Sequence, residues 1–196
     1  MKQFYYDNCT KLEINNFNGP VIFLAGPTVR GNQYDKLGPS WRVKACKLLK
    51  EYGFDGAVVL PEFTNPYESD KGRTELPVWE HNGLTRADCI LFWLPRTREL
   101  WGLNTNSEHG FWLAKDPLKL VYGRPDDAFR IAYNDIMHNQ IYHELDTTRP
   151  IYNTLEDTVK ASIELANSKW NLKQKLPFKS SWIKRFFRNF NQLNIQ

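Results

Sequence analysis

Short apolar runs alternate with amphipathic stretches along most of this chain. Five of the runs are continuous, a pattern typical of strands that are buried on both faces. They cover residues 21–25, 56–62, 89–94, 118–123 and 150–153. Between them, apolar residues recur at intervals of three and four, which predicts helices.

The predicted helices cover residues 41–53, 78–87, 106–115, 155–167 and most of 126–145. Ser40 is a typical N-cap for the first helix, Gly53 is a typical stop, and Pro77 opens the second helix. Strands that alternate with helices pair in parallel through right-handed crossovers. The pattern therefore predicts an α/β fold, a three-layer sandwich around a five-stranded parallel sheet.

Charge is distributed unevenly along the chain. The sequence has 26 Lys and Arg residues and 22 Asp and Glu residues, but residues 168–196 hold seven basic residues and no acid. Residues 1–167 therefore carry a net charge of about −3. We expect an N-terminal extension at 1–19, an α/β domain at 20–167 and a basic aromatic tail at 168–196.

The tail has the pattern of a basic amphipathic helix. Its apolar residues share one helical face opposite Lys184, Arg188 and Asn189, and Ser180 or Ser181 is the expected cap. The apolar face consists of Trp182, Ile183, Phe186, Phe187, Phe190 and Leu193. We expect this helix to dock on the body or on a neighbouring subunit. Contact with an anionic membrane surface or with nucleic acid is the alternative.

Composition narrows the class of protein. Aromatic residues make up 14% of the chain, with seven Trp, which favours pockets or interfaces lined by flat rings. No apolar run approaches the roughly 20 residues of a membrane span, and the first residues lack a signal-peptide core, so we expect a cytoplasmic protein. The three cysteines and four histidines show no ligand spacing, so we expect no metal and no cofactor.

Ligands of such parallel sheets bind outside the carboxyl ends of the strands, so the loops there are the first place to search. The loop after the first strand reads GPTVRGNQYDKLGPS and has neither a GxGxxG nor a GK[ST] phosphate motif. Gly26 would let the backbone approach a flat ligand, and Arg30 could meet an anionic group. A tight turn with a solvated arginine accounts for the same residues equally well.

The stretch LNTNSEHGFW follows the third strand and contains Glu108. Residues 105–108 fit the S/T-x-x-E pattern of a capping box, which would give Glu108 a purely structural role. A carboxylate in the first turn of a helix, at the carboxyl end of a central strand, is also ionised by the helix dipole and directed into the crevice. This position, near the rings of Trp101 and Trp112, favours a role in a site.

A second acid, Glu80, lies early in the preceding helix, and Asp88 stands eight residues later, before the third strand. Retaining glycosyl transfer requires paired acids, one as nucleophile and one to support the leaving group. The structural alternative for Glu80 is an ordinary first-turn acid. For Asp88, a bond to the backbone is the favoured interpretation.

Five segments in this order resemble the nucleoside 2-deoxyribosyltransferases, especially the nucleoside 2-deoxyribosyltransferase-like branch. They are VIFLAGPT, SWRVKACKLLKEYGFDGAVVLPE, VWEHNGLTRADCILFWLPR, GLNTNSEHGFW and VYGRPDDA. The resemblance spans roughly residues 20–165. It implies a flavodoxin-like sheet with an active site at the strand ends.

The resemblance also implies roles for particular residues. Glu108 matches the nucleophile, and Glu80 matches the acid that faces the base, where the family often has Asp. Many members place a Tyr from the first strand beside the nucleophile, whereas this strand offers Ile22 and Phe23, and Gly102 stands where some members bind the sugar with Asp. The candidate substrate contacts are Gly26, Pro27, Arg30, Trp79, Asp88, Asn104 and Asn106.

The expected activity is transfer of a 2-deoxyribosyl group between nucleobases through a covalent glutamyl intermediate. The alternatives are hydrolysis of 2′-deoxynucleosides or their 5′-phosphates and, from another class, a non-catalytic nucleotide sensor. The expected partners are a nucleoside or nucleotide, a free nucleobase and further copies of the chain in a homo-oligomer.

Overall fold

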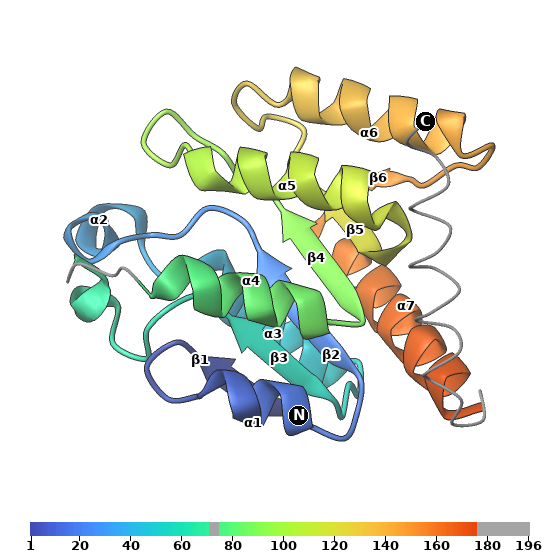
Figure 1. The fold of residues 1–196 in the computed structure, drawn as a ribbon. Coiled ribbons are helices and arrows are strands. Elements are labelled where there is room, and N and C mark those ends of the chain that lie inside the picture. The colour runs from blue at the N-terminus through green and yellow to red at the C-terminus, as the bar shows by residue number, and fades with distance from the viewer. Residues whose placement is uncertain (71–74, 176–196) are drawn as a thin grey trace, which may run out of the picture.

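The computed structural model describes residues 1–70 and 75–175 of the chain (Figure 1). Within them, six parallel strands form one sheet. The strands are β1 (Lys2–Tyr5), β2 (Val21–Ala25), β3 (Ala57–Leu60), β4 (Cys89–Trp93), β5 (Leu120–Gly123) and β6 (Ile151–Tyr152). The predicted tail helix and its alternative roles lie outside the described residues.

The sheet has the order β1-β3-β2-β4-β5-β6. All five predicted strands are present, but the prediction of a five-stranded sheet is wrong, because residues 2–5 add a strand at the edge beside β3. This edge strand is only partly buried, so it lacks the continuous apolar run that marks the inner strands. The segment expected as an N-terminal extension therefore contributes to the sheet, and Phe4 and Ile14 within it are buried in the core.

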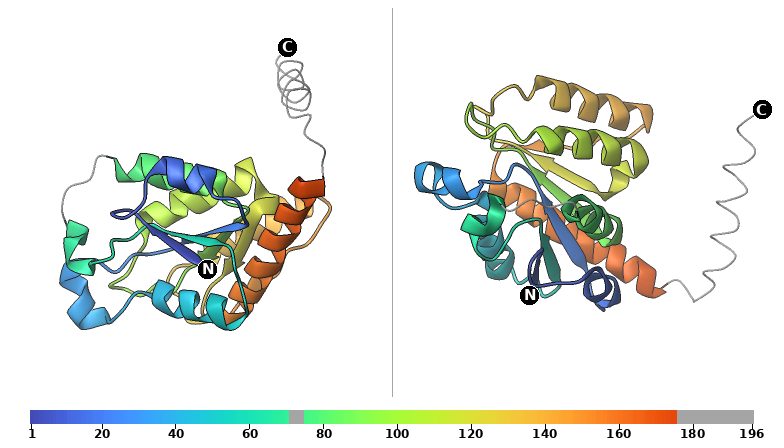
Figure 2. Two further views of the ribbon diagram at one scale, coloured as in Figure 1. Left: turned by 90° about the horizontal axis from the view of Figure 1, so that it is seen from below. Right: turned by 60° about the vertical axis from the view of Figure 1, so that its left-hand side comes forward.

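The described residues form seven α-helices. They are α1 (Lys11–Asn16), α2 (Gly31–Leu37), α3 (Trp41–Glu51), α4 (Leu76–Arg86), α5 (Leu103–Lys115), α6 (Ala132–Glu144) and α7 (Leu155–Lys175). All of them except α2 pack on the two faces of the sheet (Figure 2). Side chains of α1, α4, α5 and α6 join one buried cluster, and those of α3 and α7 join the other. The expected three layers are present because every residue of β2 and β4 is buried and both sheet faces need cover.

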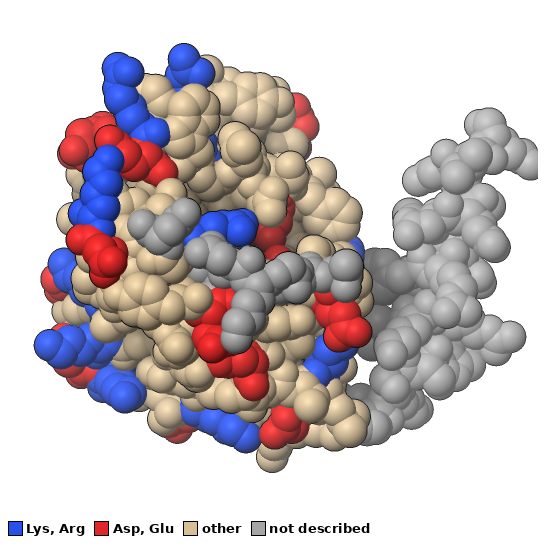
Figure 3. Space-filling view, turned by 90° about the vertical axis from the view of Figure 1, so that its left-hand side faces the viewer, with Lys and Arg blue, Asp and Glu red and all other residues tan. Residues whose placement is uncertain are grey.

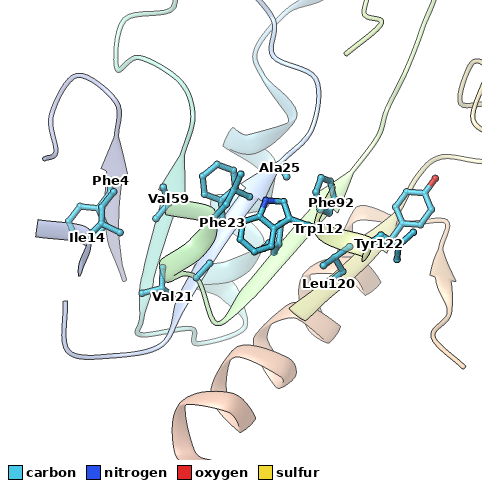
Figure 4. Close-up of a cluster of buried hydrophobic side chains, with 14 of the residues drawn as sticks. Phe4, Ile14, Val21, Phe23, Ala25, Val59, Phe92, Trp112, Leu120 and Tyr122 are labelled. Carbon is cyan, nitrogen blue, oxygen red and sulfur yellow. The ribbon is translucent and has the colours of Figure 1, made fainter. Parts of the chain in front are cut away.

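Aromatic side chains fill the layer beneath α4 and α5 (Figure 4). Trp112 of α5, Phe23 of β2 and Phe92 of β4 are each no more than 2% exposed. Gly83 of α4 lies against the Phe23 ring, where an added Cβ would stand 3.1 Å from ring atoms. This close approach fixes how α4 sits on the sheet beside α5.

Local signals placed most helix ends correctly. The Ser40 side chain accepts a hydrogen bond from the Arg42 amide at 3.2 Å and caps α3, as predicted. Gly53 follows the end of α3 with a φ of 72°, and Pro77 lies in the first turn of α4. The loop after β2 differs from expectation, because it contains the short helix α2. None of the helices in the described ranges combines the length and apolarity needed to cross a membrane.

Candidate functional site

A cleft of about 450 Å³ opens between α4 and α5. Because α4 leads into β4 and α5 leads out of it, the first turns of both helices lie at the carboxyl edge of the sheet. Both acids that the sequence singled out line this cleft. The lining residues are Pro77, Glu80, His81 and Leu84 of α4, and Asn104, Ser107, Glu108, Phe111 and Trp112 of α5.

The cleft-lining residues of α5 recur with helical spacing. Asn104, Ser107, Glu108 and Phe111 stand at positions i, i+3, i+4 and i+7 and therefore share one face. The helix begins at Leu103, earlier than predicted. One face of α5 thus presents a carboxylate, two small polar groups and an aromatic ring to the same space.

The capping-box interpretation of Glu108 is wrong. The N-cap is Gly102, which adopts a left-handed conformation with a φ of 59°, and Glu108 lies beyond the first turn. The Thr105 hydroxyl is 3.3 Å from the position that a Cβ on Gly102 would take, so this threonine packs inside the helix start. Glu108 therefore does not cap α5, although its sequence context suggests that it would.

Glu108 is partly withdrawn from water. Burial raises the pKa of its carboxyl to about 7, and the positive charge of Arg42 acts in the opposite direction. A carboxyl group with a pKa near 7 exchanges a proton readily at neutral pH. Such a group can serve as a nucleophile when ionised or as a proton donor when neutral.

Rings form one wall of the cleft. The ring of His81 lies 5.9 Å from the rings of both Phe111 and Trp112, and these two rings are 5.5 Å apart, measured between centroids. His81 and Phe111 are exposed, whereas Trp112 is buried. Exposed ring faces and edges beside a carboxylate suit a planar heteroaromatic group that carries hydrogen-bonding atoms.

Gly26 and Pro27, predicted as substrate contacts, do not line the cleft, and their backbone binds Arg42. Their carbonyl oxygens accept hydrogen bonds from the guanidinium of Arg42, at 2.7 Å and 3.4 Å. A Cβ on Gly26 would lie 2.2 Å from the carbonyl oxygen of Trp93, so only glycine allows the loop after β2 to cross the end of β4. Arg30 is exposed at the N-cap of α2 and does not line the cleft.

Sequence reasoning missed Arg42, which is only 1% exposed. A signal was present, because Arg42, Ala45 and Leu49 share the buried face of α3 at helical spacing. An arginine on that face must find partners inside the protein, and it finds them at the carboxyl edge of the sheet.

Asn104 and Asn106 separate onto two sides of α5. Asn104 lines the cleft, whereas the side-chain oxygen of Asn106 accepts a short hydrogen bond from Arg96. Arg96 is 5% exposed and also donates to Asn134 of α6 at 3.3 Å. Asn106 is itself exposed and therefore binds at the surface end of the buried pair of Arg96 and Asn134.

Asp88 lies at the amino-terminal ends of the strands, whereas Glu108 lies at their carboxyl ends. Its carboxylate accepts a hydrogen bond from the backbone amide of Val21 at 2.9 Å and forms ion pairs with Arg86, at 3.2 Å, and with Lys173 of α7. Asp88 is 1% exposed. These contacts agree with the favoured interpretation of Asp88 as a partner of the backbone, and they leave it outside the cleft.

Trp79 also lies outside the cleft. It is 3% exposed, and its indole nitrogen donates a hydrogen bond to the carbonyl oxygen of Cys9 at 2.9 Å. Its ring meets Tyr6 edge to face, with the centroids 5.7 Å apart. Trp79 therefore joins α4 to the N-terminal segment, while its neighbour Glu80 faces the cleft.

Within residues 1–70 and 75–175, no group of three or more His, Cys, Asp or Glu residues is placed to hold a metal ion. On the face of the molecule that Figure 3 shows, basic and acidic side chains are interspersed.

A scan of the sequence against models of known protein families finds no match, and a search of curated proteins finds no significant similarity. The resemblance drawn from the five sequence segments therefore rests on the residues themselves.

Proposed function

We propose that this protein breaks the N-glycosidic bond of 2′-deoxynucleosides and transfers the deoxyribosyl group to another nucleobase. The observation that carries this proposal is that Glu80 and Glu108, from two different helices, line one cleft at the carboxyl edge of the sheet. A carboxylate that can attack and a second acid that can support the leaving group are the two parts that such a reaction needs.

The fold supports the proposal. Without the edge strand β1, the remaining strands run in the order β3-β2-β4-β5-β6, which is the 2-1-3-4-5 order of flavodoxin-like sheets. The order reverses between β2 and β4, where such sheets bind their ligands. The loop with Gly26 follows β2 and the helix with Glu108 follows β4, so both flank this position.

In the proposed mechanism, the ionised carboxylate of Glu108 attacks C1′ as the bond to the base breaks. A glutamyl ester forms with inversion at C1′, and the electron pair of the broken bond leaves with the base. Glu80 donates a proton or a hydrogen bond to the departing nitrogen. A second base then attacks C1′, releases Glu108 and restores the original configuration.

The aromatic wall supports a nucleobase as the leaving group. The edges and faces of His81 and Phe111 are exposed beside Glu80, so a planar base can lie against them while its ring nitrogens point toward the acid. The 2-deoxy sugar favours the reaction because it lacks the hydroxyl that destabilises the cationic transition state.

Hydrolysis is the second candidate, and one feature of the cleft favours it. Phe111 is 50% exposed, so the cleft is open to water in this structure. If water replaces the incoming base, it hydrolyses the glutamyl ester and releases the free sugar.

Incubation of the protein with deoxyinosine, with and without added adenine or cytosine, distinguishes these reactions by chromatography. A new deoxynucleoside that forms only with added base supports transfer, and hypoxanthine released without added base supports hydrolysis. No turnover across a panel of deoxynucleosides and their 5′-phosphates would contradict both, and would favour a nucleotide sensor.

The proposed intermediate gives a direct test of the nucleophile. After acid quench, mass spectrometry of the peptide that carries Glu108 should show a deoxyribosyl adduct, and Glu108→Gln should lose both the adduct and the turnover. Glu80→Gln should still form adduct, about 10²- to 10⁴-fold more slowly. Glu51→Gln, at an exposed position on α3, is the matched control.

The proposal places the protein in the cytoplasm as a homo-oligomer that needs no cofactor. The cysteines Cys9, Cys46 and Cys89 support the compartment, because all three are buried free thiols. Light scattering coupled to size-exclusion chromatography tests the assembly, and a monomer at working concentration would contradict it.

A further inference from the structure

The guanidinium of Arg42 reaches from α3 to the carboxyl end of β2. Its Nε atom donates to the carbonyl oxygen of Leu24 at 2.9 Å, and its Nη2 atom donates to that of Gly26 at 2.7 Å. Its Nη1 atom lies 3.2 Å from the hydroxyl of Thr28. Because Arg42 is 1% exposed, these partners replace water almost completely and fix the path of the loop 24–28.

The same guanidinium forms an ion pair with Glu62, the residue that follows β3 by two positions. The distance from Nη1 to the carboxylate of Glu62 is 2.7 Å, and the Ser40 hydroxyl donates to the same carboxylate oxygen at 2.6 Å. Glu62 is 13% exposed at its side chain. Glu62 is therefore the carboxylate that directly balances the charge of Arg42.

The loop that Arg42 holds touches the start of α5. A Cβ on Gly102, the N-cap of α5, would lie 2.9 Å from the Cβ of Pro27. Arg42 donates to the Pro27 carbonyl, and so does the indole nitrogen of Trp41, at 3.0 Å. A continuous path of contacts therefore runs from Arg42 through Pro27 to the helix that carries Glu108.

The charge of Arg42 also acts on Glu108. Glu80 and His81 of α4 share the cleft of Glu108, and Arg42 of α3, which does not line the cleft, acts on the Glu108 carboxyl group through its charge. Arg42 lowers the pKa that burial raises. A cation near a buried carboxyl group favours its ionised form, because the two charges attract in a medium of low dielectric constant.

We propose that Arg42 is the positioning residue for Glu108: it fixes the loop that contacts the start of α5, and its positive charge attracts the Glu108 carboxylate. The catalytic consequence rests on the proposed function, whereas the electrostatic coupling does not.

The coupling is tested by titrating Glu108 directly. The full chain is labelled with ¹³C at the glutamate side-chain carboxyl groups, and the Glu108 resonance is identified by its loss in Glu108→Gln. The expected midpoint in the unmodified protein is about pH 7. Glu62→Gln should lower the midpoint by roughly half a unit or more, because it removes the carboxylate that balances Arg42 while Gln can still accept its hydrogen bonds.

Arg42→Gln should move the midpoint in the opposite direction, since it removes the cation. Arg86→Gln is the matched control, because Arg86 also pairs with an acid, Asp88, and binds the carbonyl of Phe17 at 2.9 Å, but at the far edge of the sheet. This control should leave the Glu108 titration unchanged. If Glu62→Gln leaves the midpoint unchanged or raises it, the proposal is overturned, and this result does not depend on whether Arg42→Gln folds.

The positioning role is tested by Arg42→Lys, which keeps the charge but has one nitrogen in place of the three that Arg42 uses to bind the loop. We expect kcat with deoxyinosine to fall at least about tenfold with little change in KM, because a displaced carboxylate attacks poorly. An unchanged kcat would contradict the positioning role. If the unmodified protein turns over no deoxynucleoside, the proposed function fails, and the titration still decides the inference about Arg42.

Discussion

His109 of α5 and His138 of α6 lie side by side in the protein interior, with their ring centroids 6.4 Å apart and their planes within 20° of parallel. Each is 1% exposed. Each also has one ring nitrogen without a hydrogen-bond partner among the described residues, Nε2 in His109 and Nδ1 in His138. A positive charge on either imidazole would therefore have neither water nor a full set of hydrogen-bond acceptors around it.

This pair predicts acid sensitivity. Burial lowers the pKa of His109 to about 3 and that of His138 to about 4. Both histidines stay neutral in the folded state below pH 6.5, whereas the unfolded chain takes up protons there. Stability is therefore complete above about pH 6.5 and is lost as the pH falls toward 4, by about 1.4 kcal/mol per pH unit for each histidine.

Urea unfolding of the unmodified protein and of His138→Gln between pH 7.5 and pH 4.5 measures this effect. The variant should show the smaller fall in unfolding free energy, because it has one fewer proton to bind on unfolding. Parallel curves for the two proteins would show that His138 already carries a proton in the folded state.

Ionisation of Glu108 should lower the unfolding free energy of the protein. Its pKa rises from the usual 4.5 to about 7 in the folded state, so the folded protein resists loss of this proton and is destabilised as the pH rises from 4.5 to 7. Glu108→Gln should therefore raise the unfolding free energy at pH 8 by about 1 to 3 kcal/mol. At pH 4 the two proteins should be equally stable, and a variant that is less stable at pH 8 would contradict the assigned burial.

The same pKa predicts the pH profile of the reaction. If Glu108 is the nucleophile, its ionised fraction rises from about one tenth at pH 6 to about nine tenths at pH 8. Initial rates of deoxyinosine turnover should rise by about this ratio over the same interval. Rates that fall across it would identify Glu108 as the proton donor and exchange the roles of the two glutamates.

Gly102 and Gly110 offer a matched pair of substitutions in α5. Gly102→Ala should lower the unfolding free energy by about 1 to 2 kcal/mol, because alanine disfavours a φ of 59° and its Cβ would meet Pro27. Gly110→Ala should raise it by up to about 1 kcal/mol, because this helical position is exposed and has no atom within 4 Å of the new Cβ.

Measuring the turnover of both variants shows whether each glycine has a structural role or contacts the substrate. Gly102→Ala should also reduce turnover, because the start of α5 shifts against the loop after β2. Gly110→Ala should leave turnover unchanged. A loss of activity in a stabilised Gly110→Ala protein would show that a substrate approaches the helix at Gly110.

Asp88 should contribute to the stability of the fold and not to substrate binding. Asp88→Ala leaves Arg86 and the Val21 amide without their buried partner and should lower the unfolding free energy by about 3 kcal/mol. Lys173→Met should cost much less, because the side chain of Lys173 is 54% exposed. Thermal denaturation measures both changes. A KM altered more than about twofold in folded Asp88→Ala would restore Asp88 as a substrate contact.

The pattern of apolar positions predicted much of the fold. The four inner strands are continuous apolar runs because helices cover both faces of the sheet, and any polar residue within them would be buried. The edge strand β1 escaped prediction because only one of its four residues is fully buried.

The candidate site was only partly predictable. Glu80 and Glu108 were found because each stands early in a helix next to a central strand, and such positions converge in any sheet of this order. Trp79 and Glu80 are adjacent in sequence yet face the core and the cleft, because successive helical residues point about 100° apart. The sequence could not show which of the two residues faces the cleft, because this depends on how α4 packs against the sheet.

The sequence by itself determined the order of the elements, their mostly buried faces and the two acids at the carboxyl edge, because all of these follow from local periodicity and chain connectivity. Only the tertiary structure decided that Glu108 is not a cap, that Asp88 serves the far edge and that Arg42 reaches the loop beside α5. These depend on contacts between residues far apart in the chain, where burial and a neighbouring charge set what each side chain can do.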